Sequence, residues 1–131
     1  MWMLDTDICS YILRDQPKGI QAHFDRIDLD QLAISSVVLA ELQFGVARLP
    51  SPGKLHAAVN DFAGKMHILA WDENAAAHYA KLRTTLERRG TPIEAMDLMI
   101  AAHALSEDAI LVSNNTSHFA RVPGLKLENW T

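Results

Sequence analysis

The chain has 131 residues, of which 49% are hydrophobic and 21% charged, and its formal net charge is −4. This length and composition predict one globular domain over residues 1–131 and exclude a disordered chain. The net acidity argues against binding nucleic acid through bulk positive charge, though a local basic patch is compatible with it. No apolar run reaches membrane-spanning length, the N-terminus lacks a signal-peptide pattern, and the single cysteine excludes an internal disulfide, so we expect a cytoplasmic protein without membrane contact.

Apolar runs that predict strands alternate with helical patterns along the first half of the chain. Residues 1–4 and 32–35 are predicted strands. Between them we predict a helix starting at residue 5 or 6 and, after a break at Gln16-Pro17, a second helix whose apolar face extends to Ile27. After residue 35, Ser35 or Ser36 is predicted to cap a third helix.

The second half continues the same alternation. The Pro-Ser-Pro-Gly segment at 50–53 is predicted to be a loop, with a helix after it. Asp72 is predicted to cap a long helix that ends at Gly90, where a glycine after basic residues is a typical stop signal. The remaining predicted elements are strands at 67–71, 109–113 and 125–130, a helix at 93–107, and a short turn or helix after Asn115.

This alternation predicts an α/β fold with a central, mainly parallel sheet covered by helices on both faces. In such sheets functional sites lie at the carboxyl ends of the strands. Asp5 and Asn115 directly follow predicted strands, and Glu41 and Asp97 lie in helices that begin at or point toward the same edge. The four side chains, although far apart in sequence, are therefore expected to converge.

Three carboxylates beside apolar segments are costly unless a shared partner stabilises them, and a divalent metal ion is the simplest such partner. Carboxylate and amide oxygens suit Mg²⁺ or Mn²⁺, which can activate water and neutralise a phosphodiester. Taken singly, Asp5 is equally well a helix cap. An exposed helix residue is the favoured interpretation of Glu41 alone, and a turn or cap residue that of Asn115 alone. Asp97 is harder to explain as a purely structural residue, because an unpaired acid beside the apolar segment Leu-Met-Ile-Ala-Ala would be costly. It is the four residues together that favour a functional site.

Four segments, in order, resemble the PIN-domain nucleases, and more narrowly the VapC toxins of bacterial toxin–antitoxin pairs. They are Met-Leu-Asp-Thr-Asp at 3–7, Ile-Ser-Ser-Val-Val-Leu-Ala-Glu-Leu-Gln-Phe-Gly at 34–45, Met-Asp-Leu-Met-Ile-Ala-Ala-His-Ala at 96–104, and Leu-Val-Ser-Asn-Asn-Thr-Ser-His-Phe at 111–119. Each motif alone is weak, but together they cover nearly the whole chain. The resemblance implies a PIN-like α/β/α sandwich and a Mg²⁺- or Mn²⁺-dependent endoribonuclease.

The resemblance also implies roles for individual residues. It maps metal-binding acids onto Asp5, Glu41 and Asp97, and its fourth catalytic position, often Asp, falls on Asn115. Two departures from the family pattern bear on the site: Asn115 supplies no negative charge, and His118 stands where an acid often precedes the aromatic residue. Thr6, Asp7 and Ser113 are expected to contact the metal ligands rather than the metal itself.

The implied substrate is RNA, most specifically initiator transfer RNA cut in its anticodon stem-loop. The implied partner is a VapB-type antitoxin whose tail covers the acidic site, within a toxin homodimer and larger complexes that bind promoter DNA only through the antitoxin. Phe44, Leu49 and the 50–53 loop are candidates for a groove that binds this partner. Candidate contacts to the RNA backbone are Arg14, Lys18, Arg48, Lys81, Arg83, Arg88 and Arg89.

Two other functions compete with this interpretation. An aspartyl-phosphate enzyme would use Asp5 as nucleophile, but a lysine near the site would be expected and residues 97–115 contain none. A catalytically silent PIN module that binds RNA or protein would retain metal without cleavage, and Asn115 gives that alternative some support. His103 falls on another face of the helix from Asp97 and is expected to be structural, and Cys9 is expected to be buried.

Overall fold

A five-stranded parallel sheet forms the centre of the protein, and the computed structural model describes residues 1–14, 17–50 and 53–131. The strand order is β3-β2-β1-β4-β5, with every neighbouring pair parallel. The strands are β1 (Trp2–Leu4), β2 (Leu32–Ser35), β3 (His67–Leu69), β4 (Ile110–Val112) and β5 (Lys126–Glu128). The predicted parallel α/β architecture is confirmed.

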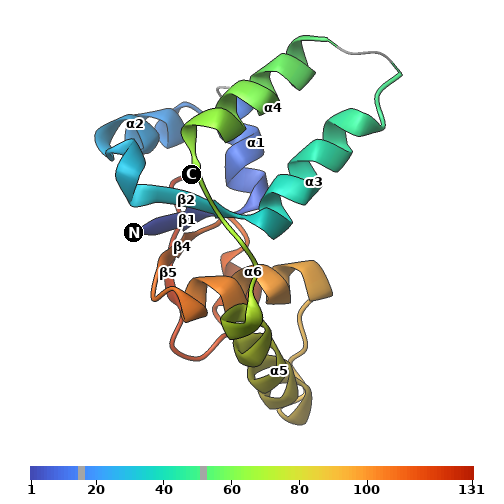
Figure 1. The fold of residues 1–131 in the computed structure, drawn as a ribbon. Helices are drawn as coiled ribbons and strands as arrows, with labels where there is room; N and C mark the ends of the chain where they lie inside the picture. Colours follow the sequence, from blue (N-terminus) through green and yellow to red (C-terminus); the bar gives the residue numbers. More distant parts are fainter. Residues whose placement is uncertain (15–16, 51–52) are drawn as a thin grey trace.

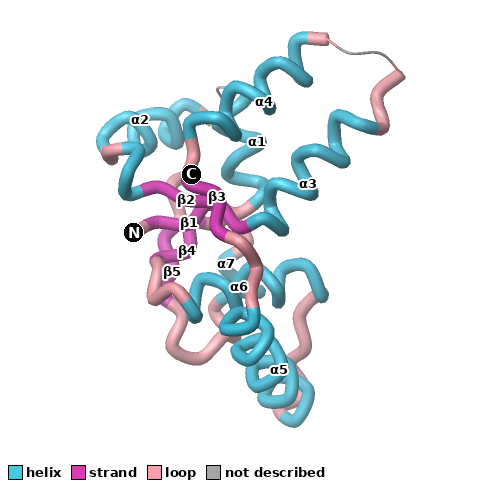
Figure 2. The backbone as a smooth tube through the Cα atoms, in the orientation of Figure 1, coloured by secondary structure: helices cyan, strands magenta, loops and turns pink. Residues whose placement is uncertain are grey.

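Helices cover both faces of this sheet (Figure 1). They are α1 (Thr6–Arg14), α2 (Lys18–Arg26), α3 (Ser36–Ala47), α4 (Lys54–Lys65), α5 (Glu73–Arg88), α6 (Ala95–Ser106) and α7 (Thr116–Phe119), with a 3-10 turn η1 at Leu29–Gln31. Helices α1 and α2 lie on one side of the sheet, α5 and α6 on the other, and α3 and α4 form a hairpin that projects away from the sheet (Figures 1 and 2). This arrangement gives the three α/β/α layers.

The core lies around the three central strands, because strands covered on both faces have no polar face. Every residue of β2 is buried, and Met3 of β1 pairs with Ala33 on one side and Leu111 on the other. The register places the ends of β1, β2 and β4 at one edge of the sheet. The residues that follow these strands, among them Asp5 and Ser113, therefore meet at that edge.

Local signals in the sequence fix where several helices start and stop. The Ser35 hydroxyl accepts a hydrogen bond from the Val37 amide and caps α3, and Asp72 caps α5 in the same way. Gly90 follows α5 with φ of 68°, a conformation that favours glycine. These predicted boundaries are confirmed.

Other predicted boundaries were wrong by a few residues. Helix α2 ends at Arg26, and Ile27 is already extended, so it does not continue the helical face. Helix α6 begins at Ala95 rather than 93 because Glu94 is its cap. The strands predicted at 67–71, 109–113 and 125–130 are each shortened to three residues. The break at Gln16 and the centre of the 50–53 loop lie outside the described residues.

Within the described parts of the chain, we find no helix with the length and apolarity that crossing a membrane requires.

Candidate active site

Asp5 lies where β1 ends, beside the end of β4. Its backbone amide donates to the carbonyl of Val112 at 3.1 Å, which extends the pairing of the two strands by one residue. Its carboxylate Oδ1 accepts a hydrogen bond from the Ile8 amide at 2.9 Å, so Asp5 caps α1. The capping role considered from the sequence is therefore present, and it occupies only one carboxylate oxygen.

The electrostatic environment of Asp5 disfavours its ionised form. Asp5 is only 5% exposed, and burial raises the pKa of its carboxyl to about 6. Hydrogen bonds from the Ser113 side chain and the Ile8 amide oppose this rise, whereas the negative charges of Asp7 and Asp97 add to it. A buried carboxyl with other acids nearby is suited to a cation that would stabilise its charge.

Asp97 lies in the first turn of α6 and belongs to the same electrostatic cluster. Burial and the charges of Glu94 and Glu41 raise the pKa of its carboxyl, whereas contact with His118 lowers it. Its side chain remains 26% exposed, so it is accessible from solvent. Asp97 thus combines a partly buried carboxylate with an open approach.

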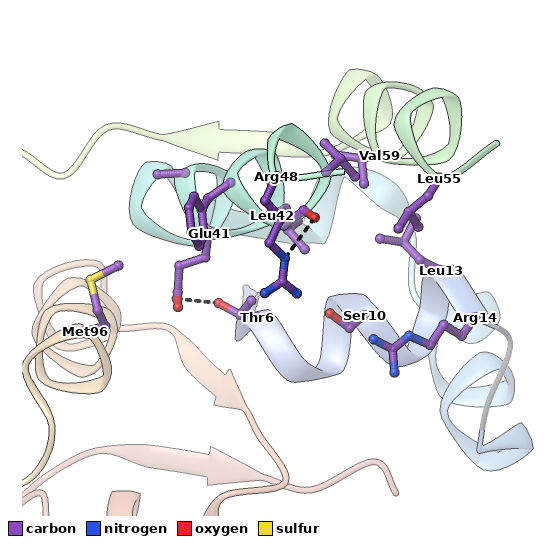
Figure 3. Close-up of a pocket in the computed structure, with 14 residues that line it drawn as sticks. Thr6, Ser10, Leu13, Arg14, Glu41, Leu42, Arg48, Leu55, Val59 and Met96 are labelled. Carbon is purple, nitrogen blue, oxygen red and sulfur yellow. Dashed lines mark hydrogen bonds between the residues drawn. The ribbon is translucent and has the colours of Figure 1, made fainter. Parts of the chain in front are cut away.

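Glu41 reaches the same edge from α3. The Thr6 hydroxyl donates a hydrogen bond of 2.6 Å to Glu41 Oε1, and this contact links the start of α1 to the second turn of α3 (Figure 3). Thr6 therefore orients the Glu41 carboxylate. Glu41 also acts electrostatically on Asp97, which ties all three predicted acids into one cluster.

Asn115 and Ser113 come from the segment that follows β4. The Ser113 hydroxyl accepts a hydrogen bond from the Asn115 amide of the backbone at 2.9 Å, and its side chain also bonds Asp5. The side-chain Nδ2 of Asn115 donates to Asp97 Oδ2 at 3.3 Å and lies 2.9 Å from His118 Nδ1. Ser113 and Asn115 therefore connect Asp5 on one side with Asp97 on the other.

The donors at this edge suit a hard divalent cation, since they are carboxylate, amide and hydroxyl oxygens. Within residues 1–14, 17–50 and 53–131, no three His, Cys, Asp or Glu side chains already enclose a common point as a metal cage. Glu41 is instead bonded to Thr6, and Asn115 turns its amide nitrogen toward Asp97. The side chains fit a cation chemically, and binding one would require them to exchange these contacts.

A groove of about 650 Å³ opens beside the acidic cluster, between α1 and the α3–α4 hairpin (Figure 3). Glu41, Thr6 and Met96 line one end, and Leu13, Leu55 and Val59 line the other. Two arginines, Arg14 and Arg48, lie along it. The groove is thus mainly apolar, carries two positive charges, and leads directly to Glu41.

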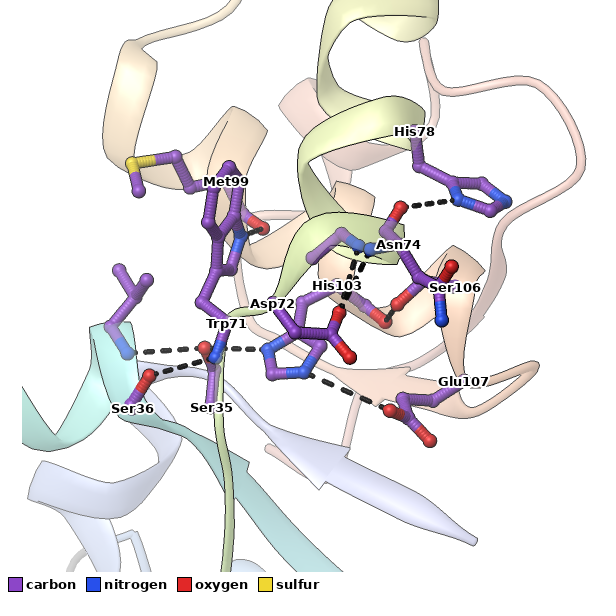
Figure 4. A network of polar contacts seen from close by, with 12 residues as sticks. Ser35, Ser36, Trp71, Asp72, Asn74, His78, Met99, His103, Ser106 and Glu107 are labelled. Atoms are coloured by element: carbon purple, nitrogen blue, oxygen red, sulfur yellow. Dashed lines mark hydrogen bonds and ion pairs between the residues drawn. The ribbon is translucent and has the colours of Figure 1, made fainter.

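A second polar network joins the start of α3 to α6 (Figure 4). His103 is fully buried, and its Nδ1 lies 2.7 Å from the Ser35 hydroxyl. The Trp71 backbone amide donates to the Ser36 hydroxyl, and the Trp71 indole donates to the carbonyl of Met99. These bonds hold the start of α3, which carries Glu41, against α6, which carries Asp97.

The protonation of His103 follows from these contacts. The Ser35 hydroxyl, which accepts from the Val37 amide, also forms a hydrogen bond with His103 Nδ1. Nε2 has no hydrogen-bond partner within 3.5 Å among the described residues, and its nearest carboxylate is Glu107 at 4.0 Å. Burial lowers the pKa of His103, so the ring is neutral. The predicted structural role of His103 agrees with these contacts.

The structure brings to the site one residue that the sequence did not single out, His118, and it leaves Asp7 at the surface. His118 was noted only as a departure from a family pattern, yet its ring contacts both Asn115 and Asp97. Its position three residues after Asn115, within one helical turn, was a signal that the two side chains meet. Asp7 is exposed and touches the site only through its charge on Asp5.

Comparison with known proteins identifies what the chain resembles. The family model for the PIN domain matches residues 2–125. The tRNA(fMet)-specific endonuclease VapC of Salmonella typhimurium is 36% identical over 129 residues, covering 98% of this chain and 97% of the relative. Ribonuclease VapC2 of Rickettsia felis is 38% identical over 134 residues, covering 99% and 98%. The crystal structure of VapBC2 from Rickettsia felis, bound to a DNA fragment from their promoter, superimposes with a TM-score of 0.91 at 37% identity, covering 99% of this chain and 98% of that one.

Proposed function

Because this chain belongs to the VapC family of PIN-domain ribonucleases, the toxins of VapBC toxin–antitoxin systems, we propose that it cuts initiator transfer RNA in the anticodon stem-loop in a reaction that depends on Mg²⁺ or Mn²⁺. In this proposal Asp5, Glu41, Asp97 and Asn115 are the catalytic residues. A relative named a tRNA(fMet)-specific endonuclease, 36% identical over nearly the full chain, supports the choice of substrate.

The observation that carries the proposal is the raised pKa of Asp5, to about 6, together with that of Asp97 at the same sheet edge. Burial is the largest cause for both carboxyls, and neighbouring acids add to it. A cation at this edge would offset the burial and mutual repulsion that disfavour the ionised carboxylates. This electrostatic effect supports a cation site built from Asp5 and Asp97, with Glu41 directed toward it by Thr6.

The chain's own residues have distinct tasks in this proposal. Asp5 and Asp97 hold the cation, which when bound supplies activation of water and neutralisation of phosphodiester charge. Thr6 fixes one oxygen of Glu41, and Ser113 fixes the orientation of Asp5. The site stays accessible on the Asp97 side, where an RNA phosphate can approach.

The groove offers contacts for RNA next to the acids. Arg14 and Arg48 line this groove, and Glu41 lines the same groove. Arg83, another candidate from the sequence, is less available, since it bonds Glu87 and Tyr79 on its own helix. We therefore assign phosphate contacts first to Arg14 and Arg48, with selectivity arising from RNA shape and single-stranded bases.

The same groove is our proposed docking surface for the VapB antitoxin. Phe44, which is 66% exposed, and Leu55, which is also exposed, both line the groove, so a partner segment with apolar side chains would bury them. Leu49 is a further exposed apolar residue, just after α3. Such a segment would end at Glu41 and exclude RNA from the arginines. We further propose that the toxin forms a homodimer, and that its larger complexes bind promoter DNA through the antitoxin. A related VapBC pair has been crystallised on promoter DNA, which supports this part of the proposal.

The substrate is tested by incubating the antitoxin-free chain with purified initiator transfer RNA, elongator methionine transfer RNA and bulk RNA in Mn²⁺. We expect discrete cuts in the anticodon stem-loop of the initiator alone, mapped by primer extension. Equal cutting of both transfer RNAs would contradict the substrate assignment while leaving the nuclease intact.

A catalytically silent PIN module remains the second candidate, because Asn115 provides an amide where the family often has an acid. That candidate predicts RNA binding in a gel-shift assay with no cleavage of any RNA in either metal. An Asn115→Asp variant that gains cleavage over an inactive parent would support it.

A further inference from the structure

His118 is placed to contribute a nitrogen to an otherwise oxygen-based site. It lies in α7, a short helix held in place by Phe119, which is 1% exposed and buried in the core. The amide of Phe119 also donates to the carbonyl of Asn115. This anchoring places the His118 ring against Asp97 of α6 and Asn115 of the segment after β4.

The contacts of Asn115 indicate what the His118 nitrogen faces. Asn115 Nδ2 lies 2.9 Å from His118 Nδ1 and 3.3 Å from Asp97 Oδ2. An amide nitrogen only donates, so His118 Nδ1 must present its lone pair, with the ring proton on Nε2. A nitrogen lone pair and a carboxylate oxygen therefore both point at one positively polarised group, in the manner of two ligands directed at a cation.

The spacing of these two acceptors is compatible with one metal ion. His118 Nδ1 and Asp97 Oδ2 are 3.8 Å apart. Ligands that each lie about 2.1 Å from a metal can be separated by at most about 4.2 Å. Rotating the Asn115 amide about its terminal torsion, which is soft, would replace the donor with the carbonyl oxygen and supply a third ligand.

We propose that His118 and Asn115 join Asp5 and Asp97 as ligands of the same divalent ion, which gives it a mixed oxygen and nitrogen set, and that His118 makes this site prefer Mn²⁺ over Mg²⁺. The proposal rests on the metal dependence proposed above and adds a ligand and a selectivity to it. Imidazole nitrogen binds transition metals much better than it binds Mg²⁺, which favours oxygen ligands and water. His118 is also 42% exposed, so its ring can turn to a ligand without disturbing the core.

The test uses the full-length, antitoxin-free protein after removal of metal with EDTA. Mn²⁺ and Mg²⁺ affinities are measured by calorimetry, and bound Mn²⁺ is examined by pulsed EPR for coupling to a histidine nitrogen. The variants are His118→Gln, which removes the nitrogen ligand, and His67→Gln, a matched change at an exposed histidine of β3 outside the site. Circular dichroism and thermal unfolding check that both variants fold.

We expect nitrogen coupling in the wild type and in His67→Gln, and its loss in His118→Gln. The ratio of Mn²⁺ to Mg²⁺ affinity should fall by about tenfold or more in His118→Gln alone, as expected for losing a group that tunes a metal. Mn²⁺ binding without nitrogen coupling, or with an unchanged ratio in His118→Gln, would overturn the proposal and leave the proposed nuclease standing. Failure of the wild type to bind either Mn²⁺ or Mg²⁺, with RNA cleavage that persists in EDTA, would overturn both proposals.

Discussion

Replacing Asp5 with asparagine should stabilise the metal-free protein while removing its activity. Asp5 is buried, and the rise in its pKa from 3.8 to about 6 means that ionising it opposes folding. This rise corresponds to about 3 kcal/mol of unfolding free energy at pH values well above 6. Asparagine keeps the acceptor for the Ile8 amide but carries no charge.

The expected net gain in the free energy of unfolding of Asp5→Asn is smaller than this electrostatic contribution of about 3 kcal/mol. The amide NH₂ of asparagine cannot accept the hydrogen bond that the Ser113 side chain makes with Asp5, and losing a buried hydrogen bond costs about 1 kcal/mol or more. We therefore expect Asp5→Asn to raise the free energy of unfolding by about 1–2 kcal/mol at pH 7.5 in EDTA.

The dependence on pH separates this electrostatic effect from altered packing. Between pH 3.8 and 6 the folded state of the wild type holds the Asp5 proton more tightly than the unfolded state, so stability is lost as pH rises through this window. The advantage of the variant should consequently grow by about 1–2 kcal/mol between pH 5 and pH 7.5.

Urea unfolding at both pH values, in EDTA, measures this difference, with Asp30→Asn at an exposed acid as the control. The control should show no such change with pH. Adding saturating Mn²⁺ should stabilise the wild type and not Asp5→Asn, because a ligand that binds only the folded state raises stability. An advantage that is the same at pH 5 and pH 7.5 would refute the electrostatic account of Asp5.

Three further changes test separate parts of the structure. His103→Leu leaves the buried Ser35 hydroxyl without its hydrogen-bond partner and should cost about 1–3 kcal/mol by urea unfolding at pH 8. His103→Asn, which retains a side-chain donor and acceptor, should cost less, and equal losses would argue against the hydrogen bond. Thr6→Val removes the 2.6 Å hydrogen bond to Glu41 and should slow single-turnover RNA cleavage about tenfold. The free energy of unfolding should change by less than about 1 kcal/mol. An unchanged cleavage rate would show that Glu41 does not need this hydrogen bond. Phe44→Ala should weaken binding of the cognate VapB antitoxin about tenfold or more by calorimetry without altering thermal unfolding, and unchanged affinity would place the partner elsewhere.

The sequence predicted the parts of this structure that depend on local pattern. Buried apolar runs located the strands, and side chains directly after them located the sheet edge where Asp5 and Ser113 meet. The caps at Ser35 and Asp72 were predictable because capping depends on a few consecutive residues.

Contacts between distant segments were not predictable in the same way. The bond between His103 and Ser35 joins residues 68 positions apart, and nothing in either local pattern specifies it. The contact of His118 with Asp97 depends on how α7 packs against α6, which a single sequence does not determine. The extended conformation of Ile27 likewise reflects the turn into η1 rather than the apolar spacing that suggested a longer helix.

We propose that the acids at the sheet edge bind a divalent ion and cut RNA. The most direct measurement is the single-turnover rate of initiator transfer RNA cleavage by wild type, Asp97→Asn and the exposed control Asp30→Asn, each in Mn²⁺, Mg²⁺ and EDTA. We expect discrete cuts by wild type and control in metal, none in EDTA, and a cleavage rate about a hundredfold or more lower in Asp97→Asn. Cleavage that persists in EDTA, or that Asp97→Asn performs at the wild-type rate while folded, would contradict this proposal.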